Sequence, residues 1–218
     1  MTFISERAGD VFRFGRRYPV LASAGAVAAV FLLWLVLPPG PPFREDCSRV
    51  AYDVQGRLLC ARLAADGQYR FPLLHDSLPA KYIAAVTTCE DRNFFRHPGV
   101  DPVALVKAAA INLRKKKRVR GGSTITMQVV RLSHPENRTY INKVIECLTA
   151  LRLSLHFSKA DILRLYAAHV PMGGNTVGLG AASWRYFGKP LSKITWAEAA
   201  LFTVLPNNPS MINMGRKR

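Results

Sequence analysis

The chain has 218 residues, enough for one domain of ordinary size with an appendage, and 49% of them are hydrophobic, which excludes an intrinsically disordered protein. With 31 lysines and arginines against 14 aspartates and glutamates, the formal net charge is +17. This excess predicts an anionic partner: a nucleic acid, lipid headgroups or a phosphorylated substrate. Charge alone does not choose among the three.

The first predicted element is a membrane-spanning helix over residues 18–38. Residues 18–37 carry no charged side chain, and at ~1.5 Å per residue they reach across a hydrocarbon core of ~30 Å. Four arginines lie within residues 1–17, so the positive-inside rule predicts a cytoplasmic tail there and an extracytoplasmic location for the rest. The alternative is a cleaved signal peptide, whose apolar core is normally shorter.

Residues 39–78 are predicted to form a stiff, proline-rich linker and a short membrane-proximal β segment. Short apolar runs alternate there with turn sequences around Gly56 and Gly67, which predicts two or three small strands. Cys47 and Cys60 flank the predicted hairpin and can form a disulfide in an oxidising space.

Residues 79–212 are predicted to form a mainly α domain, followed by a basic end over residues 213–218. Its apolar residues recur at helical spacing, and helices are expected over residues 140–155, 159–169 and 195–205. Cys89 and Cys147 lie in such apolar patterns and are predicted to be buried free thiols. The cysteines and the five histidines lack metal-ligand spacing, so no metal site built by the protein is predicted.

Two adjacent acids, Glu90 and Asp91, follow an apolar helical stretch. A carboxylate half-buried at such a point has its proton affinity raised by desolvation and can act as a general base. The alternative is an exposed acid pair at a helix end. The aromatic pair and the His-Pro-Gly turn that follow, within residues 94–99, favour a functional site.

A second cluster combines glycines, hydroxyls and cations. Residues 121–124, Gly-Gly-Ser-Thr, lack the spacing of a nucleotide-binding P-loop, but their amides and hydroxyls can hold a phosphate or a sugar. Arg131 lies one helical turn beyond Gln128, and Lys143 and Glu146 also share one helix face. For Lys143 and Glu146, an ordinary surface ion pair is the alternative.

Five cations lie within residues 115–120. On a domain tethered to a membrane they are predicted to meet anionic headgroups, at about 1 kcal/mol per cation. A nucleic-acid binder is the alternative, and the predicted membrane span argues against it.

Five blocks between residues 79 and 210 resemble the family 51 glycosyltransferases, the peptidoglycan glycosyltransferase module of class A penicillin-binding proteins and of their monofunctional relatives. Residues 90–99 resemble the family's EDxxFxxHxG, and residues 121–128 its GGSTITxQ. The other three blocks resemble RKxxE at Lys143, KxxILxxY from Lys159 and AAxxYFGKxxxxLTxxEAAL from Ala181. Met127 and the sequence Ala-Ala-Ser-Trp at 181–184 are similar to the 1C type.

The resemblance implies a lysozyme-like α domain that polymerises lipid II into β-1,4-linked glycan strands and releases undecaprenyl pyrophosphate. Glu90 is then the base that deprotonates the acceptor 4-hydroxyl, and Glu146 assists on the pyrophosphate side. The implied substrate-binding residues are Lys107, Ser123, Thr124, Gln128, Arg131, Arg138 and Lys143. Mg²⁺ or Mn²⁺ is expected to be held mainly through the substrate pyrophosphate.

The same resemblance implies partners and a location. The expected partners are lipid II, the growing lipid-linked glycan, the membrane and cell-wall synthesis proteins, with no nucleic acid. The expected location is the bacterial inner (plasma) membrane, crossed once, with the N-terminus cytoplasmic and the catalytic domain periplasmic or extracytoplasmic. A 1C-type protein would continue past Arg218 into a transpeptidase domain, so a monofunctional form or an interrupted gene is implied.

Two departures from the family pattern support an alternative function. Asn142 replaces an arginine before Lys143, and Ala168 replaces an asparagine in the fourth block. A weakened or non-catalytic scaffold that binds lipid II is therefore the alternative. A lytic enzyme of lysozyme-like fold is a third hypothesis, and the implied donor-site cations count against it.

Overall fold

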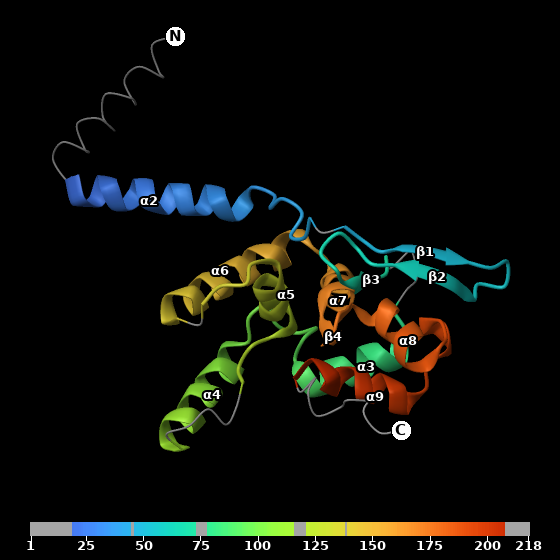
Figure 1. Cartoon of the computed structure of the whole chain (residues 1–218). Helices are drawn as coiled ribbons and strands as arrows, with labels where there is room; N and C mark the ends of the chain where they lie inside the picture. Colours follow the sequence, from blue (N-terminus) through green and yellow to red (C-terminus); the bar gives the residue numbers. More distant parts are fainter. Residues whose placement is uncertain (1–18, 45, 73–77, 116–120, 138, 208–218) are drawn as a thin grey trace, which may run out of the picture. The chain divides into compact units, whose positions relative to one another are not determined.

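The structure is a computed structural model that describes residues 19–207, apart from residues 45, 73–77, 116–120 and 138. The chain divides into two compact units, Met1–Gly40 and Pro41–Arg218. The described part is mainly helical with two small sheets (Figure 1). The predicted mainly α class is therefore confirmed. The predicted tail over residues 1–17 and the predicted basic end over residues 213–218 lie outside the described residues.

The first unit contains helix α2 (Pro19–Val36), whose 18 residues have no acidic residue in the first turn and no basic residue in the last. Among the residues that the structure describes, none of the helices combines the length and the apolarity required to cross a membrane. Of the range 18–38 in which a spanning helix is predicted, the structure describes residues 19–36 as helical.

The second unit begins with an antiparallel hairpin of β1 (Arg49–Tyr52) and β2 (Leu58–Arg62), as the turn sequence around Gly56 predicts. Asp53 holds this turn, because its carboxylate accepts hydrogen bonds from the backbone amides of Gln55 (3.0 Å) and Arg57 (2.7 Å). A second sheet has the order β3 (Tyr69–Arg70), β5 (Thr176–Val177), β4 (Pro171–Gly173). The parallel pairing of β3 with β5 joins segments about a hundred residues apart, which local sequence patterns do not reveal.

All four cysteines are free thiols, so the possible disulfide between Cys47 and Cys60 is not formed. Cys60 pairs with Ala51 in the hairpin, whereas the chain beside Cys47 has already turned to the other sheet, where the Ser48 amide donates to Arg70 O (2.7 Å). Cys89 is exposed instead of buried, and Cys147 is half-buried. Burial raises the pKa of the Cys147 thiol.

Seven α-helices and two 3₁₀ turns make up the rest of the described part of this unit. Four of the helices begin at a hydroxyl residue, Thr124, Thr139, Ser158 or Thr195, whose side chain accepts a hydrogen bond from the backbone amide three residues later. The elements are α3 (Ala80–Glu90), α4 (Pro102–Lys115), α5 (Ile125–Ser133), α6 (Tyr140–His156), α7 (Lys159–His169), α8 (Leu179–Phe187), η1 (Leu191–Lys193), α9 (Trp196–Val204) and η2 (Leu205–Asn207).

Helix α5 lies at the centre of the packing. Ile125, Met127 and Val129 are fully buried, and α5 packs against α6 on one side and α7 on another. Helices α3 and α9 also pack together, side by side in Figure 1. As a result, the end of α3, the start of α5 and the end of α9 are held in fixed positions by one hydrophobic core.

Gly178, just before α8, is expected to be irreplaceable. Its φ is +82°, and a Cβ there would lie 2.3 Å from the carbonyl oxygen of Ala168. Gly56 is a matched control, because its φ is +73° but no atom lies within 4 Å of its Cβ position. We expect Gly178→Ala to lower the free energy of unfolding by about 3 kcal/mol or more, and Gly56→Ala by about 1 kcal/mol. Equal losses in urea unfolding would contradict this difference.

Candidate active site

Glu90 is the last residue of α3 and is half-buried, as predicted. Its Oε2 accepts a hydrogen bond from Nε2 of Gln128 (2.8 Å), and its Oε1 accepts one from Nδ2 of Asn207 (2.7 Å). Both donors are neutral amides, so the carboxylate is oriented without an ion pair in these two contacts. Asn207 was not among the predicted site residues. It follows the fifth motif, and no spacing rule connects it to Glu90.

Asp91 has a different role from its neighbour. It is buried, and its carboxylate lies 3.0 Å from Nε2 of His97. Its Oδ2 also accepts a hydrogen bond from the backbone amide of Ile125 (3.0 Å) at the start of α5. Asp91 therefore ties the first motif to the N-terminus of α5, where a negative charge is favourable.

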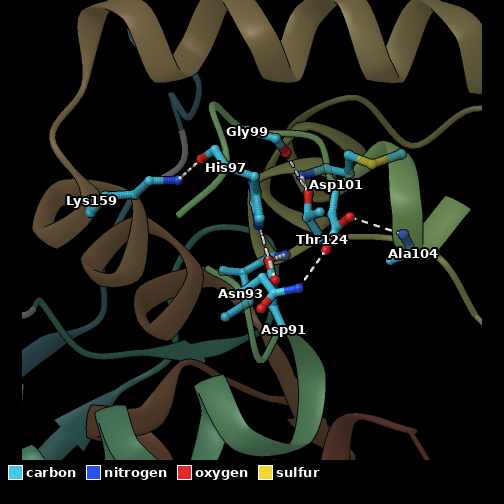
Figure 2. A network of polar contacts seen from close by, with 10 residues as sticks. Asp91, Asn93, His97, Gly99, Asp101, Ala104, Thr124 and Lys159 are labelled. Carbon is cyan, nitrogen blue, oxygen red and sulfur yellow. Dashed lines mark hydrogen bonds and ion pairs between the residues drawn. The ribbon is translucent and has the colours of Figure 1, made fainter. Parts of the chain in front are cut away.

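The loop between α3 and α4 is held by further polar contacts, which Figure 2 shows around Asp91 and His97. Asp101 accepts from Nδ2 of Asn93 (3.0 Å) and from the amide of Ala104 (2.9 Å). The hydrogen bond from Asn93 is the main cause that holds the pKa of Asp101 below its usual range. The loop is thereby fixed to the first turn of α4.

Residues at the start of α7 and of α5 also form hydrogen bonds with this loop. Lys159, the first residue of α7, donates to the carbonyl of His97 (2.7 Å) and lies 4.5 Å from the centre of the Phe94 ring. Burial lowers the pKa of Lys159. Thr124 donates to the carbonyl of Gly99 (2.6 Å). Thus Thr124 caps α5 and also stabilises the loop that follows Glu90.

Lys143 lies in the first turn of α6 and faces the start of α5. Its Nζ donates to Oγ of Ser123 (2.7 Å) and to Oε1 of Glu146 (2.9 Å). The side chains of Lys143 and Glu146 are 33% and 13% exposed, so this ion pair is partly buried. A cation, a hydroxyl and a carboxylate meet here, a combination that suits an anionic ligand.

The other three predicted cations are Arg131, Lys107 and Arg138. Arg131 is half-buried near the end of α5, and its charge reaches the buried hydroxyl of Tyr166. Burial is the main cause that raises the pKa of Tyr166; Glu90 raises it further and Arg131 lowers it. Glu90 and Arg131 therefore both lie within electrostatic reach of the Tyr166 hydroxyl. Lys107 is exposed on α4, and Arg138 lies outside the described residues.

Asn142, where the family pattern has arginine, is engaged locally. Its side-chain Nδ2 donates to the carbonyl of Asn137 (2.8 Å), and its backbone amide donates to Oγ1 of Thr139 (3.1 Å). The side chain thus stabilises the turn before α6. Within the described residues, no group of three or more histidine, cysteine or acidic side chains could hold a metal ion.

The fold and site define a mainly helical domain with groups for glycosyl transfer: a half-buried carboxylate and a cluster of hydroxyl, cation and acid at the start of α5. The model of the Transglycosylase family matches residues 57–218, and the chain belongs to this family. The resemblance drawn from the sequence blocks is thereby confirmed. The roles of the individual site residues stay predictions.

The relatives are penicillin-binding proteins. Over 195 residues the chain is 39% identical to penicillin-binding protein 1C of Escherichia coli (strain K12), an alignment that covers 87% of this chain and 25% of that protein. Over 206 residues it is 36% identical to penicillin-binding protein 1A of Aquifex aeolicus (strain VF5), covering 89% and 28%. The chain thus spans about a quarter of the length of these curated relatives.

Proposed function

We propose that this chain is a peptidoglycan glycosyltransferase that polymerises lipid II into β-1,4-linked glycan strands and releases undecaprenyl pyrophosphate. The observation that carries the proposal is the position of Glu90: its half-buried carboxylate is held at the end of α3 by hydrogen bonds from Gln128 and Asn207. Membership of the Transglycosylase family supports it.

In this mechanism Glu90 removes the proton of the acceptor 4-hydroxyl. The resulting oxygen attacks the anomeric carbon of the donor on the face opposite the α-linked pyrophosphate, so the new bond is β. Negative charge then develops on the leaving pyrophosphate, and Lys143, Arg131, Lys107 and Arg138 are the positive groups proposed to stabilise it. Ser123, Thr124 and Gln128 are proposed to line the donor side.

We place the domain at the extracytoplasmic surface of the bacterial inner membrane, where its lipid-linked substrate and growing glycan are held. Two segments support contact with lipid. Val106 and Leu113 on α4 are 69% and 82% exposed, and Tyr140 and Ile141 at the start of α6 are 94% and 72% exposed. Apolar side chains this exposed are typical of contact surfaces when they gather on an element. Cell-wall synthesis proteins are the proposed protein partners.

The test is polymerisation of labelled lipid II by the full chain, followed by separation of the products by size. Glycan polymer that lysozyme digests is the expected product. Binding of lipid II without polymer would instead support the scaffold hypothesis, which Asn142 favours. Cleavage of preformed glycan strands would support the lytic hypothesis.

Removal of divalent cations is expected to slow the reaction roughly tenfold, because Mg²⁺ or Mn²⁺ neutralises charge on the leaving pyrophosphate. Glu146 would supply one carboxylate, although its Oε1 already accepts a hydrogen bond from Nζ of Lys143 (2.9 Å), and one carboxylate is sufficient when phosphates supply the other ligands. Treatment with EDTA should lower the rate, and added Mg²⁺ should restore it. EDTA saturated with Mg²⁺ is the control. An unchanged rate would mean that the side-chain cations are sufficient.

A further inference from the structure

The carboxylate of Glu90 is held from two sides by amide groups that come from distant parts of the chain. Gln128, on α5, contacts Oε2 at 2.8 Å, and Asn207, on η2, contacts Oε1 at 2.7 Å. Each carboxylate oxygen has two lone pairs. One lone pair on each oxygen is therefore used, and the others are available to a substrate hydroxyl.

The side-chain amide of Gln128 is itself oriented by a hydrogen bond. The hydroxyl of Tyr166 lies 3.4 Å from Oε1 of Gln128 and donates to it. Tyr166 is 2% exposed, so its ring cannot move without disturbing the core. This contact turns the amide nitrogen of Gln128, rather than its oxygen, toward Glu90.

The Asn207 side depends on tertiary packing. Asn207 ends the short turn η2 that follows α9, and α9 packs along α3, the helix that ends at Glu90. Leu205, the first residue of η2, is 1% exposed and anchors this turn in the core. The side chain of Asn207 is exposed, so it contributes little to the core, and it donates a hydrogen bond to Glu90.

We propose that Asn207 is a positioning residue for the general base Glu90. With Gln128 it fixes the plane of the carboxylate, so that a free lone pair points at the acceptor hydroxyl. Neutral donors suit this task, because a cation in the same place would stabilise the carboxylate and weaken it as a base. The inference rests on the proposed function, since it assumes that Glu90 is the base.

The test compares Asn207→Asp and Asn207→Ala in the full chain. Aspartate has the shape of asparagine but lacks the N–H donor and places a second negative charge against Glu90. We expect Asn207→Asp to lower kcat about a hundredfold and Asn207→Ala about tenfold, with KM for lipid II within about twofold of wild type. The acidic limb of the kcat profile of Asn207→Asp should move to higher pH, because two touching carboxylates retain a shared proton.

If Asn207 had a merely structural role, the results would differ. The Asn207→Asp variant would then keep the wild-type kcat, or it would have a lower melting temperature and an unchanged pH profile. Either result would overturn the proposal. Gln55→Glu is the matched control: it makes the same amide-to-acid change in the exposed turn between β1 and β2 and should retain full activity.

Wild type and Glu90→Gln together separate this inference from the proposed function. If wild type itself does not polymerise lipid II, the proposed function fails; if Glu90→Gln polymerises lipid II as wild type does, Glu90 is not the base and the role of Asn207 fails with it. If Glu90→Gln is inactive while Asn207→Asp retains the wild-type kcat and pH profile, only the role of Asn207 fails.

Discussion

Replacing Glu90 by glutamine is expected to lower the rate of lipid II polymerisation about a thousandfold. A glutamine has nearly the same shape but cannot accept the proton of the acceptor hydroxyl, and general-base catalysis is typically worth about 10²–10⁴. The side-chain amide would also oppose one of the two amide donors that now contact the carboxylate, Gln128 and Asn207. The measurement is the initial rate with labelled lipid II at saturating substrate.

Two controls make this result specific. Glu136→Gln makes the same change at an exposed acid in the turn after α5 and should leave the rate unchanged. The binding of lipid II to Glu90→Gln should stay within a few-fold of wild type, because the donor-side cations are intact. A Glu90→Gln variant that retains more than a tenth of the wild-type rate would remove Glu90 from the role of base.

Replacing Lys143 by methionine is expected to lower kcat about a hundredfold and to weaken binding of the substrate. Methionine keeps an apolar stem but removes the ammonium that contacts Ser123 (2.7 Å) and Glu146 (2.9 Å). The leaving pyrophosphate would then meet the carboxylate of Glu146 without this cation, and loss of one preorganised charge typically costs about 10²–10³ in kcat. The measurement is kcat and KM for labelled lipid II.

Lys193→Met is the matched control for charge, because Lys193 is exposed in the turn η1. It should retain the wild-type kcat. Lys143→Arg restores the charge with a different shape, and we expect it to recover part of the lost rate. If Lys143→Met and Lys193→Met behave alike, the contact among Ser123, Lys143 and Glu146 is a structural one only.

The helices could be predicted well from the sequence, because helical periodicity and capping act within a few residues. The helix expected over 159–169 is observed as Lys159–His169, with Ser158 as its cap. The helix expected over 140–155 is observed as Tyr140–His156. The neighbours Lys143 and Glu146 follow directly, since residues three apart on a helix share a face.

Contacts between residues far apart in the sequence were predicted less accurately. Glu90 and Asp91 look alike in the sequence, but Glu90 contacts two amides at the edge of the core, whereas Asp91 is buried against His97 and the start of α5. The possible disulfide between Cys47 and Cys60 is not formed, because Ser48, next to Cys47, pairs with Arg70 instead of the hairpin.

The sequence by itself determined the family, the mainly helical class, most helix positions and the identity of the candidate acids and cations. These depend on local spacing and on motifs that occupy continuous stretches of chain. Only the tertiary structure decided that Asn207 contacts Glu90 across 117 positions and that Asp91 fastens α5. Such contacts arise when α3, α5 and α9 share one hydrophobic core, and the packing of that core is a property of the whole domain rather than of any segment.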